Sequence, residues 1–113
     1  MDNLTKDAQK LICLMYKKYL ESRKAGKPKS EAKCFGSSRD IQASMLSKES
    51  VEDVDETCRE LSRAKYAVVY YADDMAYDVT ISDSAIVCME NRFKNGLVGV
   101  IDFLTKIIPL PLS

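Results

Sequence analysis

Apolar side chains near the start of the chain recur every three or four positions, which is the spacing of one face of an α-helix. This pattern predicts a helix over residues 4–24 that begins near Thr5 and is ended by Gly26 and Pro28. The loop at residues 23–29 is basic and rich in helix breakers. The inner face of the predicted helix consists of Leu4, Ala8, Leu11, Ile12, Met15, Tyr19 and Leu20.

A short strand and a second helix are predicted next. The strand covers residues 32–35, and Gly36-Ser37-Ser38 supplies a turn and an N-cap for a helix over residues 39–46. Its inward-facing side chains would be Ile41 and Met45.

A third helix is predicted over residues 51–64, after a connecting turn at Ser47-Lys48-Glu49. Ser50 and Asp53 resemble a capping box at its start, with Asp in place of the usual Glu. Apolar side chains at intervals of three and four form its buried stripe, which is Val51, Val54, Cys58 and Leu61.

Near Tyr66 the apolar pattern changes to the two-residue period of β-strands. Residues 67–71 and 77–81 are predicted to form a β-hairpin around a turn at Asp73-Asp74. Ser82 then caps a fourth helix, which runs to about residue 93 and whose inner face is Ile86, Met89 and Phe93.

The chain ends in a fifth predicted helix, residues 97–108, which follows Asn95-Gly96 and is closed by Pro109 and Pro111. Its apolar residues cover more than one face, so part of the helix is available for a neighbouring chain. The candidate dimer-interface residues are Leu97, Val100, Ile101, Leu104 and Ile108. The alternative is that this helix packs back on the first one.

Two local stretches have a recognisable pattern. Residues 61–66 read LSRAKY and look like Leu-x-x-x-Gly-Tyr, and residues 79–91 read VTISDSAIVCMEN and look like Ile-Thr-Leu-Thr-Asp-Lys-Gly-Ile-x-Tyr-Leu-Glu-Asn. Together with the order of elements, these stretches resemble small bacterial and phage winged helix-turn-helix proteins. We align Ala64 and Ala85 with the glycines of that pattern.

The resemblance covers roughly residues 4–93. It implies an α+β, mainly α fold, namely a winged helix-turn-helix with a two-stranded β-hairpin wing and an appended C-terminal helix. We expect a single domain over residues 1–113 with its core at about 4–93. Members of this family are commonly transcriptional regulators that lay the third helix in the DNA major groove, while others serve only as protein-interaction domains.

Composition narrows the function further. The 113 residues suffice for one domain with a real core, and the absence of histidine removes the commonest general base, the Ser-His and Cys-His pairs and mixed Cys/His zinc sites. The four cysteines form no Cys-x-x-Cys pair, which indicates reduced thiols in a cytoplasmic protein. We therefore predict a non-enzymatic protein and infer no metal, cofactor or small-molecule ligand.

The apolar run at residues 97–112 is too short to span a membrane and contains charged side chains. Its polar side lacks the cationic face that anionic lipid favours, which argues against attachment to a membrane surface.

Equal numbers of acidic and basic residues conceal a gradient along the chain. Residues 1–38 carry nine Lys/Arg and four Asp/Glu, residues 39–66 five and seven, and residues 67–113 three and six. The net charges are therefore +5, −2 and −3, which could steer an anionic partner.

The predicted recognition helix, residues 51–64, is acidic on its solvent side, where removing the apolar stripe leaves Glu52, Asp53, Asp55, Glu56, Arg59, Glu60 and Arg63. Carboxylates there oppose phosphate binding, although acids in the first turn also favour the positive helix N-terminus. The first hypothesis is a DNA-binding regulator whose candidate contacts are Lys27, Lys29, Lys33, Arg39, Ser47, Lys48, Arg59 and Arg63. The alternative is an interaction or dimerisation module that does not bind double-stranded DNA.

Overall fold

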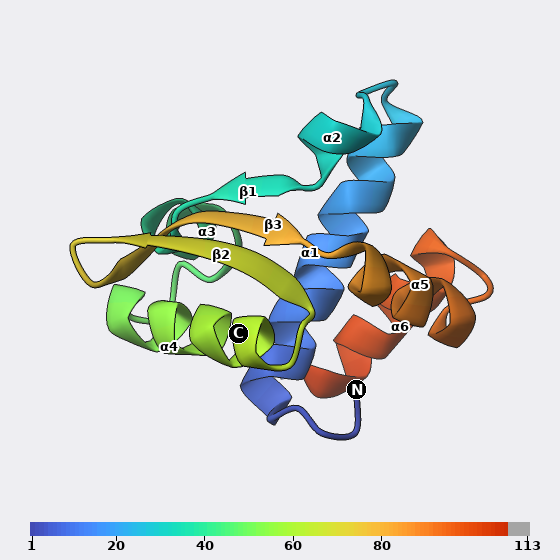
Figure 1. Cartoon of the computed structure of the whole chain (residues 1–113). Helices are drawn as coiled ribbons and strands as arrows, with labels where there is room; N and C mark the ends of the chain where they lie inside the picture. The colour runs from blue at the N-terminus through green and yellow to red at the C-terminus, as the bar shows by residue number, and fades with distance from the viewer. Residues whose placement is uncertain (109–113) are drawn as a thin grey trace.

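The computed structural model describes residues 1–108, and its longest helix, α1, spans Lys6–Lys24 (Figure 1). The side-chain oxygen of Thr5 accepts a hydrogen bond from the backbone N–H of Ala8 at 3.2 Å, which satisfies a donor of the first turn. Gly26, with a φ of 92°, ends the segment. The predicted inner face is confirmed, since all of its members are buried except Leu20, which is half-buried.

A one-turn helix, α2 (Lys29–Ala32), and a short strand, β1 (Cys34–Gly36), follow α1. The strand therefore begins two residues later than the predicted 32–35, and Ala32 belongs to a helical turn that the sequence pattern did not indicate. Gly36 closes the strand with a φ of 78°, a conformation that glycine adopts without the steric cost of a Cβ.

Helix α3 spans Ser38–Met45, one residue earlier than predicted. Its N-cap is Ser37, whose hydroxyl accepts from the Asp40 N–H at 3.1 Å, while the Asp40 carboxylate accepts from the Ser37 N–H at 2.9 Å. This reciprocal pair is a capping box. Ser38, which we grouped with the cap, is completely buried instead.

Helix α4 spans Val51–Arg63 and begins at Ser50, whose hydroxyl accepts from the Asp53 N–H at 3.1 Å. Three members of the predicted stripe are buried and Val51 is half-buried. The helix ends in a Schellman arrangement, in which the Tyr66 N–H donates to the Leu61 carbonyl at 2.9 Å.

The left-handed residue at this helix end is Lys65, with a φ of 68°. We aligned the glycine of Leu-x-x-x-Gly-Tyr with Ala64, and that alignment is wrong: counted from Leu61 the glycine falls at Lys65, and Ala64 has an ordinary φ of −82°. Ala85 lies within a helix and also needs no left-handed backbone. A lysine therefore carries the strained conformation that glycine usually relieves.

The predicted β-hairpin is confirmed as β2 (Ala67–Ala72) and β3 (Met75–Ile81). Asp73 and Asp74 both have positive φ, of 53° and 63°, as the tight type I′ hairpin turn requires. The register shifts near Tyr70, so that Tyr71 pairs with Ala76 and Tyr77 is left as an extra residue on β3.

The sheet has three antiparallel strands rather than the two-stranded hairpin alone, because β1 pairs with β3. The strand order is β1-β3-β2, which leaves β2 at one edge (Figure 1). Val79 and Ile81 are buried on the face that the helices cover, whereas Val68 and Tyr70 are exposed on the other. The sheet is therefore covered on one side only.

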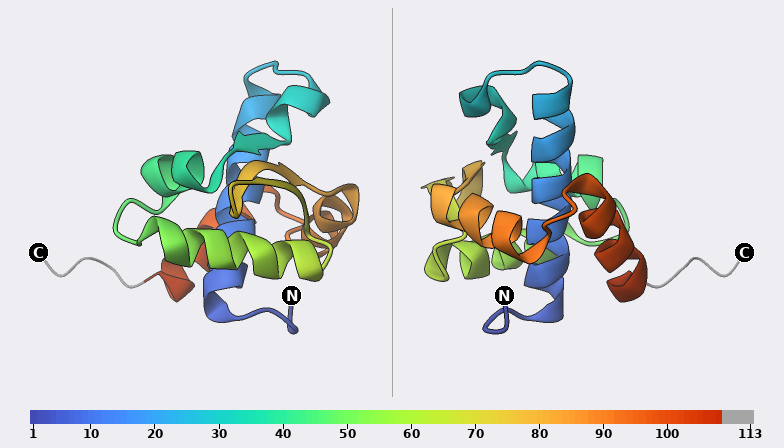
Figure 2. Two further views of the ribbon diagram at one scale, coloured as in Figure 1. Left: turned by 60° about the vertical axis from the view of Figure 1, so that its left-hand side comes forward. Right: turned by 90° about the vertical axis from the view of Figure 1, so that its right-hand side faces the viewer.

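Helices α5 (Asp83–Arg92) and α6 (Leu97–Ile107) complete the described chain. The Ser82 hydroxyl caps α5 as predicted, accepting from the Ala85 N–H at 3.0 Å. Helix α6 packs along α1 (Figure 2), and its Val100 and Leu104 are buried in the core. The predicted closing residues Pro109 and Pro111 lie outside the described residues.

The architecture is thus α+β and mainly helical, with a small antiparallel sheet. One continuous cluster of buried apolar side chains extends from Leu4 to Leu104. The core therefore reaches beyond the predicted limit of residue 93 to include α6. Within residues 1–108, no helix has the length and apolar character that crossing a membrane requires.

Candidate nucleic-acid interface

The exposed side of α4 is acidic over its first half. Glu52, Asp53 and Glu56 are exposed, and Arg63 is exposed at the far end of the helix. We also assigned Asp55 to the solvent side, and that assignment is wrong: Asp55 is only 7% exposed. The helix period alone places it outward, but the hairpin covers it.

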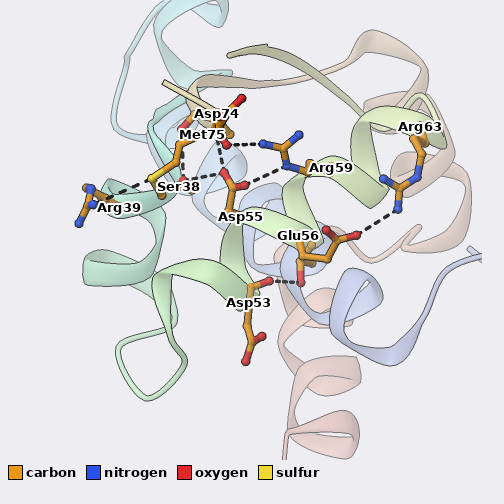
Figure 3. Close-up of polar contacts among 11 residues, drawn as sticks. Ser38, Arg39, Asp53, Asp55, Glu56, Arg59, Arg63, Asp74 and Met75 are labelled. Atoms are coloured by element: carbon orange, nitrogen blue, oxygen red, sulfur yellow. Dashed lines mark hydrogen bonds and ion pairs between the residues drawn. The ribbon is translucent and has the colours of Figure 1, made fainter. Parts of the chain in front are cut away.

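Asp55 is the centre of a buried polar cluster (Figure 3). One carboxylate oxygen accepts from the Ala76 N–H at 2.7 Å and from the Ser38 hydroxyl at 3.0 Å. The other accepts from Arg59 Nε at 2.9 Å. The Ser38 hydroxyl also lies 3.2 Å from the Ala76 carbonyl oxygen, so it shares its hydrogen between two acceptors. The cluster joins α3, α4 and β3.

These contacts keep Asp55 ionised. Burial by itself opposes the charged form, but the hydrogen bonds from Ala76, Arg59 and Ser38 together outweigh it and hold the pKa of Asp55 below its ordinary value. A carboxylate with three hydrogen-bond partners is satisfied in place and holds the hairpin against the helices.

Arg59 is committed to the same cluster. Besides its bond to Asp55, its Nη2 donates to the Asp74 carbonyl at 2.5 Å, and its guanidinium carbon lies 4.7 Å from the centre of the Tyr71 ring. These contacts fix the side chain against the hairpin. Arg59 was a predicted DNA contact, and using it for a phosphate would cost the protein these internal bonds.

The other charged groups on the second half of α4 are also paired. Arg63 lies 3.5 Å from a Glu56 carboxylate oxygen, with both side chains largely in solvent. Glu60 accepts from both the backbone N–H and the hydroxyl of Thr5, at 2.8 and 2.7 Å, and so ties α4 to the start of α1.

Three of the predicted contacts lie around α3 and the following turn. Arg39 is exposed at the start of α3, with Nη2 3.9 Å from the Met75 sulfur. Ser47 and Lys48 are exposed in the turn and line a shallow groove of about 450 Å³ whose other walls include Lys10. Among the candidate cations outside α4, Arg39 and Lys48 are the closest in sequence to its start.

The remaining candidates lie elsewhere. Lys27 and Lys29 are exposed at the end of α1 where α2 sits, while α4 lies beside the other end of α1 (Figures 1 and 2). Lys33 is paired with Asp83 at 2.5 Å, and this contact holds the pKa of Asp83 below its usual value. The basic loop does not gather beside the acidic helix.

The tip of the hairpin adds negative charge to the same side of the molecule as α4. Both residues of the turn, Asp73 and Asp74, are exposed, and Arg59 ties the turn to α4. A phosphate backbone approaching α4 and the hairpin tip would meet carboxylates from both elements.

The candidate dimer residues on α6 divide between core and surface. Val100 and Leu104 are buried within the chain, Leu97 and Ile108 are half-buried, and Ile101 is 41% exposed. Val98, at 72% exposure, is the most exposed apolar side chain of this helix. The packing on α1 that we gave as the alternative therefore accounts for much of the apolar surface of α6.

Two of the four cysteines are part of the apolar core. Cys13 and Cys58 are completely buried, and burial raises the pKa of each thiol to about 12. All four cysteines are free, Cys34 being exposed and Cys88 half-buried. Across residues 1–108, no group of three potential metal ligands comes together.

Ser38, Asp55 and Ala76 were not predicted to form a unit. The only sequence signal was the i, i+4 spacing of Asp55 and Arg59, which is typical of a helical ion pair. No family model, curated protein or solved structure matches the chain.

Proposed function

We propose that the chain is a winged helix-turn-helix domain that acts as a non-enzymatic protein-interaction module and does not read DNA through α4. The order α1, β1, α3, α4, β2, β3 and the strand order β1-β3-β2 support this topology. In this interpretation α4 corresponds to the recognition helix and the β2–β3 hairpin to the wing.

The observation that carries the functional proposal is the charge on that recognition helix and wing. Glu52, Asp53 and Glu56 stand exposed on α4, and Asp73 and Asp74 stand at the tip of the hairpin. Affinity for DNA comes mainly from cations that replace the counterions of phosphates. This surface is negatively charged, as phosphates are, and therefore repels DNA. A protein partner does not require cations here.

The placement of the basic residues supports the same proposal. Arg59 is held by Asp55 and the hairpin, and Lys33 is paired with Asp83. Lys27 and Lys29 lie by the opposite end of α1. These four candidates therefore add nothing to a groove-facing surface on α4.

DNA binding is the second candidate, favoured by Arg39, Ser47 and Lys48. All three are exposed around α3 and the turn that leads into α4, where winged-helix proteins that bind DNA contact the backbone beside the groove.

Fluorescence anisotropy with random and genomic duplexes at low salt separates the two functions. We expect no saturable binding below millimolar DNA. Micromolar binding that weakens steeply with salt and is lost in the Arg39→Ala/Lys48→Ala variant would establish the DNA-binding function instead.

A variant in which three exposed carboxylates of α4 are neutralised tests whether negative charge is what prevents DNA binding. Replacing Glu52→Gln, Asp53→Asn and Glu56→Gln removes three negative charges, and we expect about a tenfold or greater rise in non-specific DNA affinity at low salt. The same variant is the matched control for partner capture. Proteins retained by the immobilised wild type and released from the variant would be partners of the acidic surface.

A further inference from the structure

The outer edge of β2 carries backbone groups with no neighbour. The strand order places β2 at the edge of the sheet, and within residues 1–108 its backbone hydrogen bonds to another strand go only to β3. The Ser82 N–H donates to the Tyr66 carbonyl, whereas the next N–H back along the chain, that of Ile81, points the other way to the Lys33 carbonyl. Peptide groups alternate along an antiparallel ladder. Those of Ala67 and Val69 therefore point to the free edge.

The strand at this edge lacks two of the features that usually prevent strand pairing, namely charged side chains and proline. Edge strands are commonly protected by charged side chains, proline or a covering element. The segment Ala67–Ala72 reads AVVYYA and contains neither charge nor proline. Val68 and Tyr70 are 48% and 62% exposed on the open face of the sheet. Such an edge is a ready template for another strand.

We propose that this edge pairs antiparallel with β2 of a second copy of the chain, in a two-fold register centred on Val69. The two three-stranded sheets then form one continuous sheet across the dimer. A two-fold axis perpendicular to a sheet produces this isologous contact, in which the same surface is used on both sides.

The charges at the two ends of β2 select a second copy as the occupant. Lys65 precedes the strand and Asp73 follows it; both are exposed, and neither forms an ion pair in the part of the chain that the structure describes. Antiparallel pairing centred on Val69 sets Lys65 of each copy opposite Asp73 of the other. Both ends of the joined strands would therefore have complementary charge.

The same register pairs suitable side chains and backbone groups. Val69 meets its own counterpart, so the free peptide groups of the two copies face one another. Tyr70 lies opposite Val68 on the open face, and aromatic side chains opposite β-branched ones stabilise antiparallel pairs. A register centred on Tyr70 would set Asp73 opposite Ala67 and lose the charge pairing.

Sedimentation equilibrium combined with amide hydrogen exchange tests the proposal. We expect the chain to dimerise between micromolar and millimolar concentration. The amides of Ala67 and Val69 should become protected as the dimer forms. Those of Val68 and Tyr70, which point toward β3, should be protected at every concentration.

Charge reversal supplies the matched variants. Lys65→Asp and Asp73→Lys should each weaken dimerisation by about tenfold, because each loses two symmetric contacts, and the double variant should restore it. Circular dichroism and the unfolding midpoint confirm that each variant is folded.

Three results obtained with the purified chain alone would overturn the proposal. These are a chain that stays monomeric to millimolar concentration, a dimer in which the Ala67 and Val69 amides keep exchanging freely, and a double variant no better than the single ones. Protection of those amides that requires a different protein would also overturn it, by assigning the edge to another occupant.

Discussion

The Asp55 carboxylate holds together residues that are far apart along the chain. It accepts hydrogen bonds from Ser38 on α3, from Arg59 on its own helix and from the backbone of Ala76 on β3. Arg59 then reaches the hairpin turn through the Asp74 carbonyl. One ionised side chain therefore connects the hairpin to both helices.

Replacing Asp55→Asn should lower the free energy of unfolding by about 2 kcal/mol, because a buried charge-assisted hydrogen bond to Arg59 is lost. The matched control is Glu56→Gln, whose carboxylate is exposed on the same helix and should change stability by less than about 0.5 kcal/mol. Urea unfolding at pH 7 measures both. Equal effects would show that Asp55 acts as an ordinary surface acid.

The Asp55 contribution should depend on pH. Since the pKa of Asp55 is lowered in the folded protein, its stabilising effect is present above the unfolded pKa of about 3.9 and is lost as the pH falls through the folded value. The difference in stability between the wild type and Asp55→Asn should therefore shrink below about pH 4. A difference that stays constant from pH 7 to pH 3 would contradict this assignment.

Lys65 is a second residue with an individual effect on stability. Because it holds a positive φ, Lys65→Gly should raise the free energy of unfolding by about 1 kcal/mol. The adjacent Ala64→Gly is the control, and it should be neutral or destabilising since Ala64 has an ordinary φ. Thermal unfolding of the two variants side by side would locate the strained residue, and a stabilising Ala64→Gly would contradict the assignment to Lys65.

At the scale of elements, the long periodic segments were predictable and the short ones were not. The apolar residues that end in Cys58 and Leu61 recur at helical spacing, which predicts α4. Both side chains are buried in the structure. Helix α2 is a single turn, too short for any period to emerge. Its inward side is Ala32, which is buried although the other residues of the turn, 29–31, are exposed.

The candidate site was less predictable than the fold. A helical period assigns Asp55 to solvent because it ignores what lies above the helix. The residue of the hairpin that contacts Asp55 is Ala76, which is 21 residues later in the chain. In the same way, Lys27 and Lys29 add positive charge to the sequence, but α1 carries them away from α4. Charge counts along a chain do not indicate which charges share a surface.

The junction between β1 and α3 depends on Gly36. An added Cβ there would clash with the Asp40 carboxylate that caps α3, and φ is positive. Gly36→Ala should therefore destabilise by about 2 kcal/mol or more. Gly26→Ala is the control: its φ is also positive, but a Cβ would meet no atom within 4 Å, so it should cost about half as much. Equal losses in urea unfolding would show that the backbone conformation alone matters.

At the scale of the whole molecule, the sequence gradient becomes a separation of charge in space. The basic loop and α2 lie at one end of α1, and the acidic α4 lies beside the other (Figures 1 and 2). The molecule has zero net charge, but one end is basic and the other acidic. The end that the winged-helix interpretation assigns to recognition is the acidic one.

The last helix is part of the same core. Leu104→Ala should lower the free energy of unfolding by about 3 kcal/mol because Leu104 is buried against the rest of the molecule. Ile101→Ala, on the exposed side of α6, should cost less than about 1 kcal/mol. Denaturant unfolding of both measures whether α6 stabilises the monomer, and a Leu104→Ala variant as stable as wild type would show that α6 is detachable.

The Ser38–Asp55–Ala76 cluster also bears on the order in which the protein can fold while it is being synthesised. α3 and α4 leave the ribosome before residue 76, so the carboxylate of Asp55 must stay hydrated until the second strand of the hairpin emerges. If α3 and α4 packed over Asp55 earlier, its buried carboxylate would lack the hydrogen bond from the Ala76 N–H. We therefore expect the nascent chain to resist proteolysis only after the hairpin has been released.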